Sequence, residues 1–278
     1  MINRIPKSVA RLPTYLDRQF VSGDPSGMRS LALPVRVIEE LPFDRANFVD
    51  IEGEFLCDDM NRYLVKGVRG GLRVPAAEWV AARLADLVDL PVPATKIVEN
   101  FEGQLLFGSR RIAGAADNTT TAALLASDTR SSNGASAPGL QARLAATFVF
   151  DLFINNHDRH EGNFLCCAID GKNWIYLIDH ARSLFSRGLG EFPPKSGYGT
   201  VYVASLMRGR HGFDLAAALD LADKIERVSA ESIGQILEST PDEWLPPSEK
   251  GEFKDWWSNE RRAKLKKLRD GLNDGSFL

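Results

Sequence analysis

One stretch near the middle of the chain, residues 151–179, most constrains how this sequence can fold. An apolar segment leads into it, and a polar cluster follows at residues 157–163. Two runs of strand-forming residues come next, at 164–169 and 174–178, separated by the dipeptide Asp170-Gly171, which is typical of tight hairpin turns. The pattern predicts a buried helix, a polar loop and an antiparallel hairpin that ends at Asp179.

Such a hairpin would return Asp179 to the polar loop, beside Asp158 and Asn163. Two carboxylates about 4 Å apart repel by about 4 kcal/mol at an effective dielectric of 20, so a site that gathers them requires cations. Magnesium fits, because it prefers oxygen ligands and usually takes only one or two carboxylates from the protein. We therefore expect metal-assisted phosphoryl transfer, with Asp179 and Asn163 as Mg²⁺ ligands. Asp158 would accept the proton of an attacking hydroxyl, and Arg159 would supply a neighbouring positive charge.

The same residues leave two alternatives open. Asn, Asp, Gly and His are frequent in ordinary turns, so the loop could belong to a catalytically inactive binding or regulatory module. The imidazoles of His157, His160 and His180, together with Asp158, could instead bind zinc, iron or nickel in a metal-dependent phosphohydrolase. His157 and His160 lie in a turn-prone loop and not on an evident helix, which disfavours this second alternative.

The polar loop and the end of the hairpin carry a resemblance to a known family, through Asp158, Arg159, His160, Asn163, Ile178, Asp179 and His180. This pattern resembles the catalytic core of the atypical kinases related to the phosphoinositide 3/4-kinases. It is most similar to the HipA-like serine/threonine kinases of bacteria, over about residues 20–190. The resemblance implies an ATP- and Mg²⁺-dependent kinase that transfers the γ-phosphate to a hydroxyl, with Arg159 and His160 supporting the catalytic loop.

The fold implied by the resemblance is α+β and two-lobed, like that of protein kinases. Residues 1–110 would form a nucleotide-binding lobe, a small antiparallel β-sheet with one helix, and residues 111–278 a mainly helical catalytic lobe. Strand-forming runs and apolar periodicities agree with this division. The expected strands are at 33–38, 47–51, 62–66, 95–98 and 104–107. One expected helix begins near residue 75, and the others span 140–155, 214–222, 229–238 and 250–272.

The resemblance also assigns nucleotide-binding residues. Lys66, at the end of a strand, would pair with ATP phosphates, and Glu78, in the first turn of the next helix, would hold it in place. A Gly- and Ser-rich stretch at 22–30 is a candidate phosphate-covering loop, since small residues let backbone N–H groups approach phosphate oxygens. The remaining candidates are Ser26 and Gly27 in that stretch, and Ser109 and Arg110 at the adenine-binding hinge.

Composition limits the partners. The net charge of −3 argues against a broad nucleic-acid-binding surface, and no stretch approaches the apolar length of a membrane span. Three cysteines without a CxxC motif indicate reduced thiols, so we expect a cytoplasmic protein. The expected substrate is a protein, or the chain itself through the Ser-rich segment 113–139, which we otherwise expect to be a mobile linker. A regulatory partner is left unspecified.

Two departures from relatives limit what the resemblance implies. Asp179 is followed by His180 and Ala181, where protein kinases usually have Phe-Gly, so the familiar activation-loop switch does not transfer to this chain. The chain is also short for the toxin kinases of the family and is expected to lack an additional N-terminal subdomain. The resemblance therefore does not imply a toxin.

Overall fold

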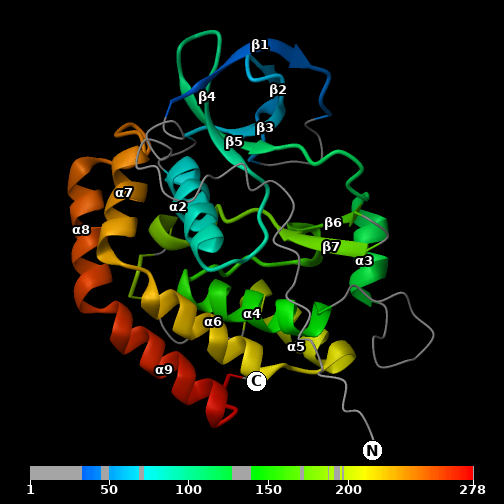
Figure 1. Cartoon of the computed structure of the whole chain (residues 1–278), viewed down its shortest axis with the longest axis vertical. Helices are drawn as coiled ribbons and strands as arrows, with labels where there is room; N and C mark the ends of the chain where they lie inside the picture. Colours follow the sequence, from blue (N-terminus) through cyan, green and yellow to red (C-terminus); the bar gives the residue numbers. More distant parts are fainter. Residues whose placement is uncertain are drawn as a thin grey trace, which may run out of the picture.

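The computed structural model describes residues 33–44, 50–68, 72–126, 139–169, 172–186, 188–190, 195 and 197–277. A small β-barrel occupies one end of the molecule and a layer of helices the other, with helix α2 and a β-hairpin between them (Figure 1). The fold is thus α+β, as the sequence predicted. Within the described residues, no helix has the length and apolar character needed to cross a membrane.

Five strands form the barrel in the order β1-β2-β3-β5-β4. Neighbouring strands pair antiparallel except β1 and β4, which pair in parallel, with Val35 opposite Val98. The predicted purely antiparallel sheet is therefore wrong at this pair. The contact joins segments about sixty residues apart, and hydrophobic patterning does not report such pairings. The strands are β1 (Val35–Leu41), β2 (Gly53–Cys57), β3 (Arg62–Lys66), β4 (Thr95–Glu99) and β5 (Leu105–Arg110).

Side chains that alternate along these strands fill the barrel, among them Phe55, Tyr63 and Val65. Gly108 is needed for this packing, because a Cβ atom there would lie 2.5 Å from Val98 Cγ2 and 3.2 Å from the Tyr63 ring. The barrel is therefore a packed core that fixes the end of β3, where Lys66 is found. The strand predicted near 47–51 lies mostly outside the described residues.

Helix α2 (Val74–Leu87) lies between the barrel and the helices (Figure 1). Pro75 is in its first turn, as expected for a residue that cannot donate an N–H bond there. Glu78 is the fifth residue of the helix, so the prediction of Glu78 in the first turn is wrong: the helix begins at Val74, and its first turn has no acidic residue. This register turns Glu78 inward, where it is 3% exposed.

After Arg110 the chain leaves the barrel and reaches the β-hairpin. Ala116 N donates a 2.8 Å hydrogen bond to Cys166 O, and helix α3 (Asn118–Ala126) follows, with Asp117 Oδ1 accepting from Thr120 N at 2.7 Å. The predicted linker over 113–139 is therefore wrong in its first half. Asp117 is a good helix N-cap, and this local signal outweighed the polar composition. Residues 127–138, with the Ser-rich stretch, lie outside the described residues.

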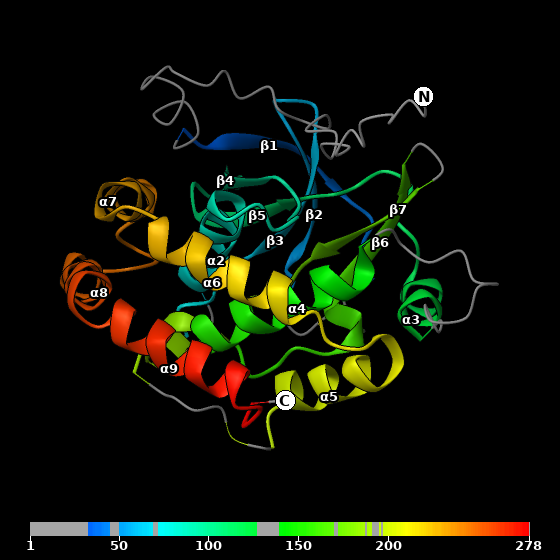
Figure 2. The ribbon, with the colours of Figure 1, turned by 60° about the horizontal axis from the view of Figure 1, so that its bottom comes forward.

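Helix α4 (Leu140–Phe153) is the central helix, buried among neighbours on several sides (Figure 2). It leads into the polar loop and the hairpin β6 (Phe164–Ile169) and β7 (Lys172–Leu177), which pair antiparallel as predicted. The turn at Asp170-Gly171 lies outside the described residues. Two short 3₁₀ turns, η2 (Glu161–Asn163) and η3 (Leu184–Ser186), flank the hairpin.

The rest of the described chain is helical. Two predictions fail here. Helix α5 was not expected, because its apolar and polar residues are mixed around the helix and give little periodic signal. The single helix expected over 250–272 is two helices that meet at Glu260, which allows Trp257 on one and Leu268 on the other to be buried. The helices are α5 (Gly199–His211), α6 (Leu215–Arg227), α7 (Ala230–Ser239), α8 (Pro247–Asn259) and α9 (Arg261–Asn273).

Candidate active site

The centre of the site is an ion-pair cluster around Lys66. The Nζ atom of Lys66, at the end of β3, contacts Glu78 Oε1 on α2 and donates a 2.9 Å hydrogen bond to Asp179 Oδ1 after β7. The predicted contact between Lys66 and Glu78 is therefore present. Two neighbouring elements, β3 and α2, and a residue 113 positions further along the chain than Lys66 thus meet at one ammonium group. The Lys66 side chain is 9% exposed and that of Asp179 is 38% exposed, so the cluster opens to solvent on the Asp179 side.

The charges in this cluster stabilise one another. Burial alone would lower the pKa of Lys66, but the carboxylates of Glu78 and Asp179 outweigh it and raise that pKa above its usual value. Burial would likewise raise the pKa of Glu78, yet the Lys66 ammonium and a hydrogen bond from His180 hold that pKa well below its usual value. Lys66 and Glu78 are therefore both charged at neutral pH.

Glu78 also holds the backbone that follows Asp179. Its Oε2 atom accepts a 3.0 Å hydrogen bond from His180 N, and the His180 ring lies 3.6 Å away through Nδ1. Asp179 itself has φ of 60°, a left-handed conformation that is uncommon for a residue with a side chain. Glu78 thus connects the position of α2 to the conformation of the loop that presents Asp179.

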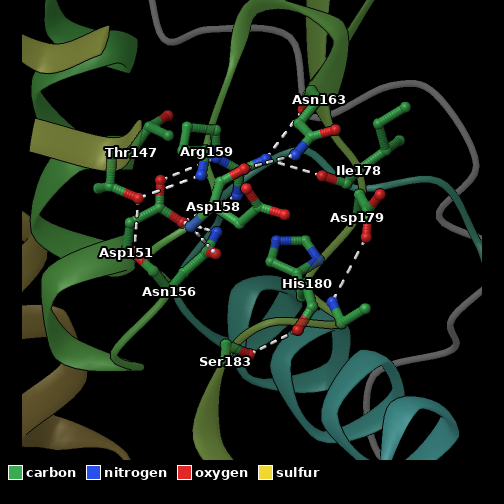
Figure 3. Close-up of polar contacts among 12 residues, drawn as sticks. Thr147, Asp151, Asn156, Asp158, Arg159, Asn163, Ile178, Asp179, His180 and Ser183 are labelled. Atoms are coloured by element: carbon green, nitrogen blue, oxygen red, sulfur yellow. Dashed lines mark hydrogen bonds and ion pairs between the residues drawn. The ribbon is translucent and has the colours of Figure 1, made fainter. Parts of the chain in front are cut away.

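Arg159 is the structural centre of the polar loop, because its side chain is fully buried and holds three segments together (Figure 3). Its Nε and Nη2 atoms each donate a 2.8 Å hydrogen bond to the carboxylate of Asp151, near the end of α4. Its Nη1 atom donates to Asn163 O at 2.9 Å and to Ile178 O at 2.7 Å. The sequence predicted Arg159 as a cation of the site and as a support of the catalytic loop. The structure places it behind the site, where it ties the loop to the end of β7.

Asp158 and Asn163 face the same region as Asp179 (Figure 3). The Asn163 Nδ2 atom donates to Asp158 O at 2.9 Å, and Asp158 N donates to Asn156 Oδ1 at 3.2 Å. The backbone of Asp158 is thus fixed on both sides, while its side chain is exposed. The polar loop and the end of the hairpin thus present to one region the three residues that the sequence predicted as base and metal ligands.

The histidines are arranged differently. His160 caps the η2 turn, with its Nδ1 atom accepting from Gly162 N at 3.1 Å, so it supports the loop as predicted. His180 is buried beside Glu78, and the His157 ring lies against Tyr198, with ring centroids 5.5 Å apart and planes tilted by 53°. No group of three or more His, Cys, Asp or Glu side chains in the described part of the chain is arranged to bind a metal ion. The histidine-metal alternative therefore has no site among these residues.

The other predicted nucleotide-binding residues are not brought to this cluster. Ser109 and Arg110 lie within β5, and Ser109 is paired with Leu64 on one side and Thr95 on the other. Arg110 N donates to Ala94 O at 2.8 Å. Their backbone groups therefore serve the barrel, and the connection between barrel and helices begins at residue 111. Ser26 and Gly27 lie outside the described residues.

Three residues of the site were missed from the sequence. Asp151 pairs with Arg159. Asn156 holds the Asp158 backbone, and its Nδ2 atom donates to Asp151 Oδ1 at 2.8 Å. Thr200, at the start of α5, accepts from Arg159 N at 3.2 Å and donates to Asn156 O at 2.6 Å. A single carboxylate near the end of an apolar helix was a signal for Asp151, since a buried charge requires a partner. Thr200 carries no comparable signal.

Comparison with known proteins assigns the chain to a class of kinases. The family model described as a HipA-like kinase matches residues 51–271, so the chain belongs to the HipA-like kinase family. The structure is similar to the proinflammatory kinase CtkA of Helicobacter pylori, with a TM-score of 0.57 and 15% identity, covering 88% of this chain and 99% of CtkA. At that identity the likeness shows the fold alone.

A second similar structure is HipA of the Shewanella oneidensis MR-1 toxin–antitoxin system, in complex with HipB and operator DNA. Its TM-score is 0.48 at 10% identity, covering 86% of this chain and 74% of HipA. Among curated proteins, none matches this chain.

Proposed function

We propose that this chain is an ATP- and Mg²⁺-dependent serine/threonine protein kinase with a two-lobed kinase fold. The observation that carries the proposal is Lys66, held between Glu78 and Asp179. An ammonium group has three donors, and these two carboxylates engage two of them, which leaves one to meet a phosphate oxygen. The cluster is open to solvent beside Asp179, whose side chain is 38% exposed.

The residues around Asp179 fit a magnesium–nucleotide complex. Asp179 uses Oδ1 for Lys66, and no described residue donates a hydrogen bond to Oδ2. The Asn163 Nδ2 atom is engaged by Asp158 O, which orients the amide and leaves its oxygen as an acceptor. These are the hard oxygen ligands that Mg²⁺ prefers. Bound there, the ion would neutralise charge on the phosphates.

Asp158 would act as the base. Its backbone is fixed at both ends by Asn156 and Asn163, whereas its carboxylate reaches solvent, where an acceptor hydroxyl can approach. Asp158 takes the hydroxyl proton, the hydroxyl oxygen forms a bond to the γ-phosphorus, and the bond from that phosphorus to the β–γ bridging oxygen breaks to release ADP. A positioned base typically contributes about 10²–10⁴-fold to the rate.

The acceptor, partners and location are proposals of the same kind. We favour a protein serine or threonine, or the chain's own Ser-rich segment, over a lipid, because the sequence has no recognisable lipid-binding module. The three free, buried cysteines are consistent with the cytoplasm. A regulatory partner would have to be identified by experiment.

The test is transfer of labelled γ-phosphate from ATP with Mg²⁺, to the protein itself and to proteins of a cell lysate. Wild type should label protein on serine or threonine, and Asp179→Asn should abolish labelling. Asp270→Asn removes an exposed carboxylate that pairs with Lys266 on α9, so it serves as the matched control and should label normally. Magnesium–ATP binding without any transfer by wild type would refute the kinase proposal and favour a binding module.

A further inference from the structure

Helix α2 is held from behind by residues of the helical part, at a distance from the site. Trp79, next to Glu78, is 1% exposed, and its Nε1 atom donates a 3.1 Å hydrogen bond to Ser239 Oγ at the end of α7. The Ser239 hydroxyl donates its own proton to Ile236 O at 2.7 Å, so it can only accept from the indole. This hydrogen bond, donated by the indole and accepted by the hydroxyl, joins two residues that are 160 positions apart in the chain.

The segment after α7 extends this contact to the barrel. Trp244 is fully buried, with its ring edge-on to Trp79 at a centroid distance of 6.3 Å. Its Nε1 atom donates to Leu105 O at 2.8 Å, and Glu243 Oε1 accepts from Leu105 N at 3.2 Å. Residues 239–244 therefore bind both α2 and the first residue of β5.

The N-terminal end of α2 is held by α8, the helix that follows α7 in the chain. Arg73, immediately before α2, donates from Nη2 to Glu249 Oε1 at 2.7 Å and from Nε to Glu249 Oε2 at 3.3 Å. Glu249 lies in the first turn of α8. This two-point pair is partly exposed, at 29% for Arg73 and 33% for Glu249. Figure 1 shows α7 (orange) beside α2 (cyan), with α8 on the outer side of α7.

These contacts limit how α2 can move. A displacement that withdraws Glu78 from Lys66 would also separate Trp79 from Ser239 and Arg73 from Glu249, and would expose two buried indoles. Helices α7 and α8 are thus linked to Lys66 through α2 and Glu78, and no described residue of either helix forms a hydrogen bond or ion pair with Lys66, Glu78 or Asp179. The α7–α8 unit, residues 230–259, connects the helices to the barrel in addition to the chain crossing at 111–117 and the Lys66–Asp179 pair.

We propose that the α7–α8 unit keeps Glu78 on Lys66, with Arg73 and Trp79 as positioning residues for ATP use. The expected change in kcat/KM for ATP rests on the proposed function, whereas the expected change in hydrogen exchange does not. The structural consequence is measured at the His180 amide, which donates to Glu78 Oε2. If Glu78 withdraws, this amide loses its acceptor and exchanges its hydrogen faster.

The experiment uses charge reversal at the partly exposed pair. Arg73→Glu and Glu249→Arg should each increase hydrogen exchange over residues 178–183 and lower kcat/KM for ATP by about 3- to 10-fold. The double variant Arg73→Glu/Glu249→Arg should restore both quantities. Lys254→Glu is the matched control, because it breaks a 3.7 Å pair with Glu238 that joins the same two helices without involving α2.

A conservative variant covers the buried contact. Trp79→Phe keeps a ring against Trp244 but removes the N–H donor to Ser239. It should likewise increase hydrogen exchange over residues 178–183 and lower kcat/KM for ATP by roughly 2- to 10-fold. Unchanged exchange at 178–183 in Arg73→Glu, or failure of the double reversal to restore it, would overturn the inference. If wild type transfers no phosphate, the proposed function fails, and the exchange measurement still decides the positioning role.

Discussion

The buried pair of Asp151 and Arg159 gives the most quantitative prediction. Each side chain is about 1–2% exposed, and the pair is bidentate, with two 2.8 Å hydrogen bonds. Burial alone would lower the pKa of Arg159, but Asp151 outweighs it and raises that pKa, so the guanidinium stays charged. In Asp151→Ala this charge would remain buried without its counter-ion.

Removing one partner of a buried pair costs about 3–5 kcal/mol, since the remaining charge is uncompensated. We therefore expect Asp151→Ala to lower the free energy of unfolding by about that amount. At roughly 2–4 °C per kcal/mol for a chain somewhat smaller than this one, the melting temperature should fall by about 6–20 °C. Urea unfolding followed by circular dichroism measures the free energy, and a thermal scan measures the melting temperature.

Two further variants test the cause. Asp220→Ala breaks an exposed pair with Lys224 and should change stability by less than about 1 kcal/mol. The double variant Asp151→Leu/Arg159→Met removes both charges and should be more stable than Asp151→Ala. It should still fail to transfer phosphate, because Arg159 no longer holds Asn163 and Ile178. A loss below about 1 kcal/mol in Asp151→Ala would refute the role assigned to this pair.

Three more predictions concern neighbouring contacts. Because the pKa of Glu78 is lowered in the folded protein, its contribution to stability is present above its ordinary pKa of 4.5 and is lost as pH falls through the folded-state value. In Lys66→Met, burial should instead raise this pKa, so the free energy of unfolding measured from pH 4 to pH 8 should fall further below that of wild type as pH rises. A difference from wild type that does not change with pH would contradict the pairing. Thr200→Val should lower kcat while leaving KM for ATP unchanged, because it removes two hydrogen bonds to the catalytic-loop backbone; a rise in KM alone would argue against this role. Gly108→Ala should destabilise the barrel by about 1–3 kcal/mol through overpacking against Val98, as measured by urea unfolding; wild-type stability would show that the barrel can adjust.

Local signals in the sequence predicted some elements closely. Strand-forming residues placed β3 at 62–66 and β6 at 164–169, with the bounds that the structure has. The all-round apolar segment after residue 140 is the buried helix α4. In these segments the residues that form the element also bury its face, so periodicity and packing agree.

Other features depend on contacts that a sequence pattern does not contain. The parallel pair of β1 and β4 closes the barrel across distant segments. Helix α5 has only a weakly apolar face, although its Thr200 forms two hydrogen bonds to the loop backbone. The contact between Lys66 and Glu78 was predicted from the order of motifs in a family. Its geometry, with Asp179 as the second carboxylate on the same ammonium, required the structure.

The most direct test of the account is the comparison of Asp158→Asn with wild type in γ-phosphate transfer, with Mg²⁺–ATP affinity measured on the same samples. The substitution changes only the Asp158 side chain and keeps the backbone hydrogen bonds to Asn156 and Asn163, so the variant should bind Mg²⁺–ATP with wild-type affinity. Transfer should fall by about 10²–10⁴-fold. Transfer at the wild-type rate would contradict the assignment of Asp158 as the base and, with it, the catalytic site described for this chain.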